Sequence, residues 1–344
     1  MNRTLVLLIA FLVLGGGVFW YFTQGEDEKT TLAGADRDFA VKNIEQIHKI
    51  FIADRRGERT TLEREGDHWI YNGKYKARPS VVTPLLEAVE RVQVKYKPPQ
   101  AAVENMVQSL ATEGIKVELY DKKGERIKAY YVGGSTSDER GTYMIMDGAE
   151  QPYVVDMPAW DGNLSVRFRR YGDEWRDKTL FAEEVENIQS VSIEYPKQRN
   201  QSFVLESTDD GYEVRPFYDI TPQIKRPYRE GSAEAFLVNF ESVGAEAFRN
   251  DYSGRDSITQ LVPFSIITLV NKQGDTTQVK LHPIVQENII SHDEKTGDYV
   301  LYSSDIERYF ADLNGKDFLL SQHLVLQKLL WGYGSFFKDN NLLN

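Results

Sequence analysis

An internal repeat of about 140 residues is the feature that most limits the folds open to this chain of 344 residues. The segments 47–52 and 188–193 both show the alternation of apolar and polar residues that is typical of a half-buried β-strand. Each is followed by a second strand-like segment that ends in an aromatic residue, Trp69 in the first copy and Tyr212 in the second. The sequence therefore predicts two tandem copies of one domain.

The rest of each copy follows the same order. Apolar residues recur at helical spacing in two sets, which are Leu85, Leu86, Val89 and Val92, and Phe236, Leu237, Phe240 and Val243. Shorter helical stretches are expected at 103–110 and 256–261, before hairpins that turn at Gly124 and Gly274. Each copy thus reads β-β-α-(α)-β-β-β. The predicted class is α+β, with a mainly antiparallel sheet and helices on one face of each duplicated domain.

The chain begins with an uninterrupted apolar run, residues 5–22, which follows the single cation Arg3 and precedes the acidic residues 26–28. Eighteen helical residues rise about 27 Å, which is enough to cross the hydrocarbon core of a bilayer. The run predicts one transmembrane helix with its N-terminus in the cytoplasm. A cleaved signal peptide is the alternative. The chain contains no cysteine, which excludes a lipoprotein anchor and disulfide bonds.

The sequence predicts seven successive parts. These are a cytoplasmic N-terminus at 1–4, the transmembrane helix at 5–22, a flexible tether at 23–36, a first repeat at 37–167, a link at 168–180, a second repeat at 181–313 and an apolar tail at 314–344. The predicted location is the inner (cytoplasmic) membrane, with the bilayer bound through residues 5–22 and the repeats outside the cytoplasm.

Composition and the absence of known motifs argue against several classes of function. A net charge of −11 and a pI near 5.1 argue against binding of nucleic acid, whose phosphates require a basic surface. The five histidines are scattered, and the chain contains no nucleophile elbow, phosphate-binding loop or dinucleotide fingerprint. We therefore predict no catalytic, cofactor-binding or metal-binding residues, and a protein that is not an enzyme.

Three segments supply candidate contact residues. The glycine-bracketed loop 133–142 offers Ser135, Thr136 and Arg140, which suit an anion nest of backbone amides, or else form a mobile hairpin loop. The link offers Arg169, Arg170 and Trp175, a composition typical of recognition surfaces, or else of packing between domains. The apolar tail offers Trp331, and it packs either on the second repeat or on a partner or bilayer.

Five stretches of the sequence carry a resemblance to a known family: residues 69–79, 131–136, 140–144, 152–155 and 175–178. Together they resemble an uncharacterised family, the domain of unknown function 4340. The resemblance covers residues 37 to about 180 well, and the second copy through its weaker echo of the first. It implies a membrane-anchored envelope protein, in some members associated with gliding-motility-type components of ABC transport systems. It implies no catalytic residues.

The leading hypothesis is therefore a non-enzymatic accessory protein of the cell envelope that binds another envelope protein. The partner expected from the resemblance is an ABC permease or an auxiliary subunit. Two alternatives stay open. The first is a glycan-binding or peptidoglycan-binding module or enzyme, which the loop 133–142 and the aromatic content of 12% favour. The second is a structural spacer between the membrane and another component.

Overall fold

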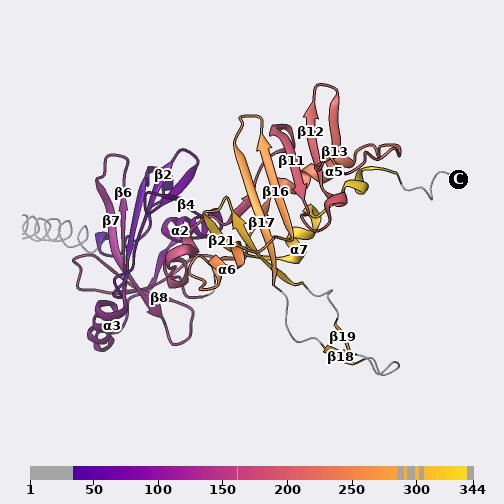
Figure 1. Cartoon of the computed structure of the whole chain (residues 1–344). Coiled ribbons are helices and arrows are strands. Elements are labelled where there is room, and N and C mark those ends of the chain that lie inside the picture. The colour runs from indigo at the N-terminus through magenta and orange to yellow at the C-terminus, as the bar shows by residue number, and fades with distance from the viewer. Residues whose placement is uncertain (1–33, 161, 285–289, 293–298, 302–305, 339–344) are drawn as a thin grey trace, which may run out of the picture. The chain divides into compact units, whose positions relative to one another are not determined.

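The computed structural model describes residues 34–160, 162–284, 290–292, 299–301 and 306–338. It divides into two compact units, with the boundary between Asp177 and Lys178 (Figure 1). The predicted transmembrane helix at 5–22 lies outside the described residues. Among the helices that the structure does describe, none is long and apolar enough to cross a membrane.

Unit 1 is built on a sheet of nine strands in its described part, paired antiparallel throughout in the order β4-β3-β2-β1-β6-β7-β8-β9-β5. The strands are β1 (Lys49–Ala53), β2 (Arg59–Glu65), β3 (His68–Tyr71), β4 (Tyr75–Lys76), β5 (Gln93–Tyr96), β6 (Ile115–Tyr120), β7 (Arg126–Ser135), β8 (Thr142–Met146) and β9 (Tyr153–Asp156). The helices are η1 (Ile44–Gln46), α2 (Pro79–Arg91), α3 (Gln100–Glu113), α4 (Ser165–Phe168) and η2 (Gly172–Trp175), where η marks a 3₁₀ helix.

Unit 2 contains an antiparallel sheet of eight strands among its described residues, in the order β13-β12-β11-β16-β17-β20-β21-β15. The strands are β11 (Ile188–Glu194), β12 (Phe203–Thr208), β13 (Gly211–Pro216), β15 (Ala247–Phe248), β16 (Ser265–Asn271), β17 (Thr276–Ile284), β20 (Arg308–Leu313) and β21 (Asp317–Gln322). Two short pairs join β10 (Thr179–Phe181) to β14 (Val243–Gly244), and β18 (Ile290–His292) to β19 (Tyr299–Leu301).

The helices of unit 2 are short. They are η3 (Val185–Asn187), η4 (Arg199–Gln201), α5 (Ser232–Leu237), η5 (Val238–Phe240), α6 (Arg255–Thr259), α7 (His323–Leu326), η6 (Gln327–Leu329) and η7 (Tyr333–Phe336). The helix predicted over 236–243 ends early, because the chain tightens into η5 after Leu237 and then enters strand β14 at Val243. The apolar residues still reach the core, since Phe236 and Phe240 are both buried.

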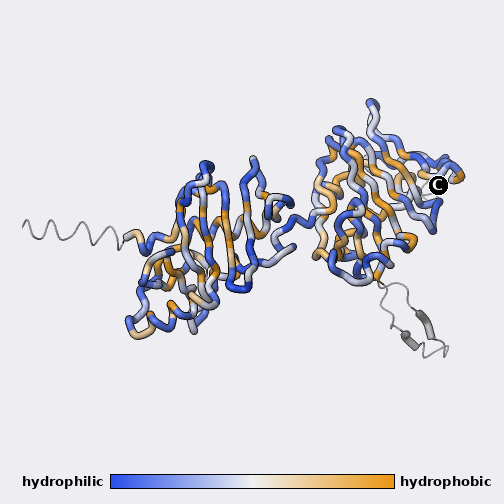
Figure 2. The backbone as a smooth tube through the Cα atoms, turned by 60° about the vertical axis from the view of Figure 1, so that its left-hand side comes forward, coloured by the Kyte–Doolittle hydropathy of each residue, from blue (hydrophilic) through white to orange (hydrophobic). Residues whose placement is uncertain are grey.

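The two sheets have the same strand order, with one difference. Strands β3-β2-β1 correspond to β13-β12-β11, the run β6-β7-β8-β9 corresponds to β16-β17-β20-β21, and β5 corresponds to β15 at the far edge. Unit 1 adds β4 beyond β3. Figure 2 shows that hydrophobic and hydrophilic residues alternate along the strands of both units, which is the pattern of a sheet with one face in the core.

The predicted α+β class, with helices on one face of each sheet, is wrong. Both units are mostly antiparallel sheet with few helices, and in unit 1 the helices lie on opposite faces. Helix α2 packs in the core that holds Tyr130 of β7. Helix α3 instead lines a cavity of about 160 Å³ with Tyr131, whose side chain points to the other face because neighbouring strand residues alternate. The alternation in the sequence predicted the strands but not which face each helix covers.

Each unit ends in a segment that returns to its own sheet, which we call the closing segment: residues 165–177 in unit 1 and 323–338 in unit 2. In unit 1 the Arg78 amide donates to the Trp175 carbonyl over 2.8 Å, and Ala77 forms an antiparallel bridge with Arg176. In unit 2 the Arg229 amide donates to the Phe336 carbonyl over 2.8 Å, and Tyr228 bridges Phe337 in the same way. The predicted link and most of the predicted tail are thus equivalent elements.

Candidate functional site

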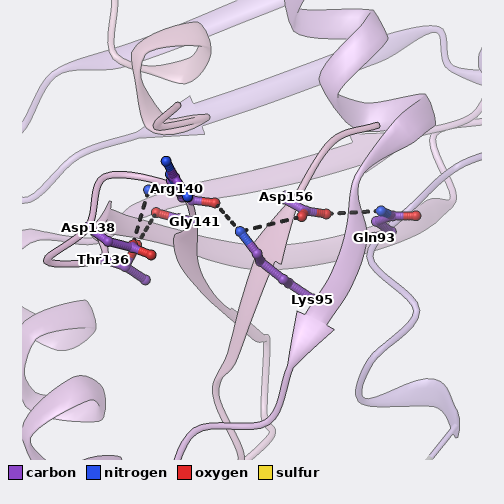
Figure 3. A network of polar contacts seen from close by, with 7 residues as sticks. All are labelled: Gln93, Lys95, Thr136, Asp138, Arg140, Gly141 and Asp156. Atoms are coloured by element: carbon purple, nitrogen blue, oxygen red, sulfur yellow. Dashed lines mark hydrogen bonds and ion pairs between the residues drawn. The ribbon is translucent and has the colours of Figure 1, made fainter. Parts of the chain in front are cut away.

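The loop that contains Ser135, Thr136 and Arg140 connects β7 to β8 and is held by its own polar groups (Figure 3). The Asp138 carboxylate accepts hydrogen bonds from the Thr136 hydroxyl and from the Arg140 amide. The bond from Thr136 lowers the pKa of the Asp138 carboxyl. Ser135 pairs with Thr142 across the hairpin. The carboxylate of the loop therefore occupies donors that a bound anion would need.

A lysine from the edge of the sheet ties this loop down. Lys95 of β5 donates to the Arg140 carbonyl over 2.7 Å and lies 3.8 Å from the Asp156 carboxylate of β9, which also accepts from Gln93 (Figure 3). Gly141 is required beside Thr136, because a Cβ there would lie 2.5 Å from the Val154 side chain. This arrangement is that of a hairpin loop, as the alternative from the sequence expected, but the loop is held by hydrogen bonds, whereas a mobile loop was expected.

The three candidates from the predicted link differ in exposure. Trp175 is fully buried, with 0% of its surface exposed, and its indole Nε1 donates to the Arg170 carbonyl over 3.0 Å. Arg170 is half-buried, and Arg169 is exposed. Trp175 therefore belongs to the core of unit 1, and Arg169 is the candidate that a partner can reach.

Arg169 lines a pocket of about 310 Å³ on unit 1. Arg55 and Arg56, from the turn between β1 and β2, contribute two further cations, whereas Asp54 and Glu113 contribute two carboxylates. The Asp54 carboxylate accepts hydrogen bonds from the Arg56 and Glu58 amides of the turn. The lining of this pocket is therefore of mixed charge with a small cationic excess.

Trp331 lines a larger pocket, of about 570 Å³, on unit 2. We call it the unit 2 pocket, and its other side chains come from Gln201, Arg226, Arg229, Leu330, Ser335 and Phe337. The Trp331 ring is half-buried against Phe236 and Phe336, at ring-centre distances of 5.4 and 5.3 Å. The guanidinium of Arg229 lies 5.5 Å from the centre of the indole ring, within range of a cation–π interaction.

The pockets on the two units lie at equivalent places in the topology. Each is lined by the connection between the first two strands of the sheet, residues 54–56 in unit 1 and Gln201 in unit 2, and by the closing segment. The cations Arg55, Arg226 and Arg229 were not among the residues predicted from the sequence. No local pattern in the sequence marks Arg229, because its place in the pocket depends on contacts with residues about 100 positions later in the chain.

His282 of β17 is a buried titratable group outside these pockets, with 4% of its surface exposed. Its Nε2 has no hydrogen-bond partner. Burial lowers the pKa of His282, Asp312 opposes this, and Lys280 adds to it. Within the described part of the chain, no group of three His, Asp or Glu side chains could hold a metal ion.

We expect unit 2 to lose stability as the pH falls below about 6.5, the ordinary histidine value. The unfolded chain then binds a proton that the folded unit resists, because the folded pKa lies below the unfolded one. The contribution of neutral His282 to the stability of unit 2 is therefore fully present above the unfolded pKa. It is lost as the pH falls from the unfolded pKa to the folded pKa. The measurement is the unit 2 unfolding midpoint between neutral and mildly acidic pH. His282→Phe should flatten the slope and His48→Gln in unit 1 should not. An unchanged slope in His282→Phe would assign the effect to another group.

Comparison with known proteins gives one family and no curated relative. No curated protein matches the chain. The family described as "Domain of unknown function (DUF4340)" matches residues 69–260, which is more than half of the chain. The match begins in β3 of unit 1 and ends just after α6 of unit 2. It leaves out residues 37–68, where the sequence resemblance was expected, and it extends into the second unit, where only a weaker echo was expected. The chain therefore belongs to the family of domain of unknown function 4340.

Proposed function

We propose that this protein is a non-enzymatic accessory protein that binds another protein through the closing segments of its two units. The observation that carries the proposal is the unit 2 pocket, which is open, about 570 Å³ in volume, and lined by Trp331 beside Arg229. Tryptophan and arginine are the residues that dominate binding energy at protein interfaces. Arginine is also a permanent cation, which suits binding better than proton transfer.

The pocket of unit 1 also supports binding of another protein. The equivalent surface carries Arg169, Arg55 and Arg56, and its position is again fixed by a closing segment whose aromatic anchor, Trp175, is buried. Side chains on a rigid element lose less conformational freedom on binding than those on a free loop. Two equivalent pockets with different linings suit two different contacts with one partner or with one assembly.

The expected setting is the cell envelope, and the assembly we propose is an ABC-type transport or gliding-motility-like complex. This setting is supported by the apolar run 5–22, which lies outside the described residues, and by the earlier resemblance to membrane-anchored envelope proteins. Cell fractionation of the intact chain tests it. Recovery with the cytoplasmic fraction would contradict the envelope location.

The proposal is tested by in-cell crosslinking, purification of the intact chain in mild detergent, and mass spectrometry of the proteins recovered with it. We expect one envelope protein in near-equal amount. The variant Arg229→Ala with Trp331→Ala should reduce its recovery, and Arg215→Ala on the exposed strand β13 is the matched control. Trp175 is left intact because its burial makes it unsuitable as a contact test. Recovery of the chain alone would show that the accessory function is wrong.

A further inference from the structure

The unit 2 pocket has a charge opposite to that of the chain as a whole. Its described lining contains Arg229, contains Arg226, which already has an interaction of its own, and contains no aspartate or glutamate, whereas the chain carries a net charge of −11. Guanidinium groups bind carboxylates through paired, charge-assisted hydrogen bonds. The pocket is therefore expected to bind negatively charged groups in preference to neutral or positive ones.

The other half of the pocket is apolar. Leu330, Trp331 and Phe337 line it, and the Trp331 ring cannot swing away freely, because Phe236 and Phe336 pack against it. The backbone is held as well, since the Tyr195 hydroxyl donates to the Trp331 carbonyl over 2.9 Å. The ligand must therefore also present an apolar group, which packs against a fixed aromatic wall.

The two halves are held side by side. The Arg229 guanidinium lies over the indole of Trp331, while its own backbone amide is bonded to the Phe336 carbonyl. Arg226 donates from Nη1 to the Lys338 carbonyl over 3.2 Å, which fixes its place at the rim. A ligand that satisfies both halves carries its acidic group within a few ångströms of its apolar group. Adjacent residues of a peptide meet this requirement.

The pocket of unit 1 lacks this selectivity. Asp54 and Glu113 lie among its arginines and would repel an acidic ligand. The volume of the unit 2 pocket, about 570 Å³, is within the range of ordinary ligand pockets and leaves room for more than one side chain. A long polyanion such as nucleic acid is disfavoured, because beyond the pocket it would meet a protein of net negative charge.

We infer that the unit 2 pocket binds an acidic peptide segment that carries one large apolar side chain. The inference rests on the proposed partner-binding function and names the chemistry of the segment that the partner offers. An acidic side chain contacts Arg229, and the apolar side chain packs on Trp331.

The test is calorimetric titration of the purified intact chain with the peptide acetyl-Asp-Glu-Phe-Glu-Asp-amide. Two matched peptides separate the contributions: one with alanine in place of phenylalanine, and one with lysine and arginine in place of the acidic residues. We expect the acidic phenylalanine peptide to bind, the alanine peptide to bind about tenfold more weakly, and the basic peptide not to bind. Binding should weaken as salt is raised, since the charges are near the surface.

Variants assign the binding to the pocket. Arg229→Ala should weaken the acidic peptide about tenfold, and Arg229→Glu should abolish its binding and admit the basic peptide. The Trp331→Phe variant should bind the acidic phenylalanine peptide more weakly than the parent does, and it should still prefer the acidic peptide to the basic one. Arg215→Ala and Trp160→Ala are the controls for loss of an exposed arginine and of a half-exposed tryptophan, and they should bind as the parent does.

Equal binding of acidic and basic peptides, or binding that Arg229→Glu leaves unchanged, would overturn the inference. Binding that is seen only after the chain is shortened behind Lys338 would also overturn it, because the occupant would then be the chain itself. The proposed function is judged separately, by the crosslinked partner. If Arg229→Glu cells yield the partner as the parent does, the inference and the unit 2 pocket as the contact site are both wrong, but the accessory function stands. If the peptide binds and no partner is recovered, the accessory function alone is wrong.

Discussion

Replacing Trp175 with alanine is expected to lower the free energy of unfolding of unit 1 by about 3–5 kcal/mol, the usual cost of truncating a fully buried tryptophan. The indole has no exposed surface, and its Nε1 bond to the Arg170 carbonyl would be lost with the ring. The Trp175 carbonyl also accepts from the Arg78 amide, so a disturbed backbone would release the edge of the sheet at β4.

The measurement is chemical denaturation of the intact chain, with the two units followed as separate transitions. Trp160→Ala is the matched control, because this tryptophan is 40% exposed and should cost far less. Arg169→Ala, on the exposed surface of the same closing segment, should leave the stability of unit 1 nearly unchanged. If Trp175→Ala lowers the free energy of unfolding of unit 1 no more than Trp160→Ala does, the Trp175 ring does not anchor the closing segment.

The second large effect is expected at the equivalent place in unit 2. Phe336→Ala should lower the free energy of unfolding of unit 2 by about 3–5 kcal/mol. The ring is fully buried and packs edge-on against Phe203 and Phe236, at ring-centre distances of 4.9 and 5.6 Å. Its carbonyl accepts from the Arg229 amide, as the Trp175 carbonyl accepts from Arg78 in unit 1.

Denaturation again distinguishes the units. Phe336→Ala should move the transition of unit 2 and leave that of unit 1 in place, and Ser335→Ala, at the exposed neighbouring position, is the control. In the double variant Trp175→Ala with Phe336→Ala, each unit should lose the same free energy of unfolding as in the single variant. The effects of substitutions at sites that share no partners are usually additive. A single shared transition that shifts with either substitution would instead show that the units unfold together.

Much of the fold was predictable, because it depends on local patterns. The alternation around Ile50 and Ile52 gave strand β1 its buried face. Gly124 and Gly274 stand at hairpin turns with φ of +82° and +90°, which glycine adopts without the strain that a Cβ adds. The predicted order of five strands in each copy was incomplete. Each expected second strand is a hairpin, β2–β3 in unit 1 and β12–β13 in unit 2, and the edge strands β5 and β15 were not expected because they are short and pair with strands distant in sequence.

The tail does pack on the second repeat, one of the two alternatives expected from the sequence. The burial of Trp175 was not predictable, for a physical reason. Trp175 follows three arginines in the sequence, so the stretch resembles an exposed link, and only the return of the chain to the edge of its own sheet buries the ring. The pockets depend on the same long-range contact. Arg226 and Trp331 are more than 100 residues apart in sequence, and no local pattern brings them together.

The closing segments also set the order in which each unit can be completed as the chain is synthesised. In unit 1 the last anchor, Trp175, stands two residues before the boundary with unit 2, and in unit 2 Phe336 follows all the strands of the sheet. The core of each unit cannot pack completely until its closing segment has been synthesised. The core of unit 1 can therefore pack completely before unit 2 is synthesised. A chain interrupted before Phe336 would thus keep a finished first unit and an open second sheet, a form that proteases can remove.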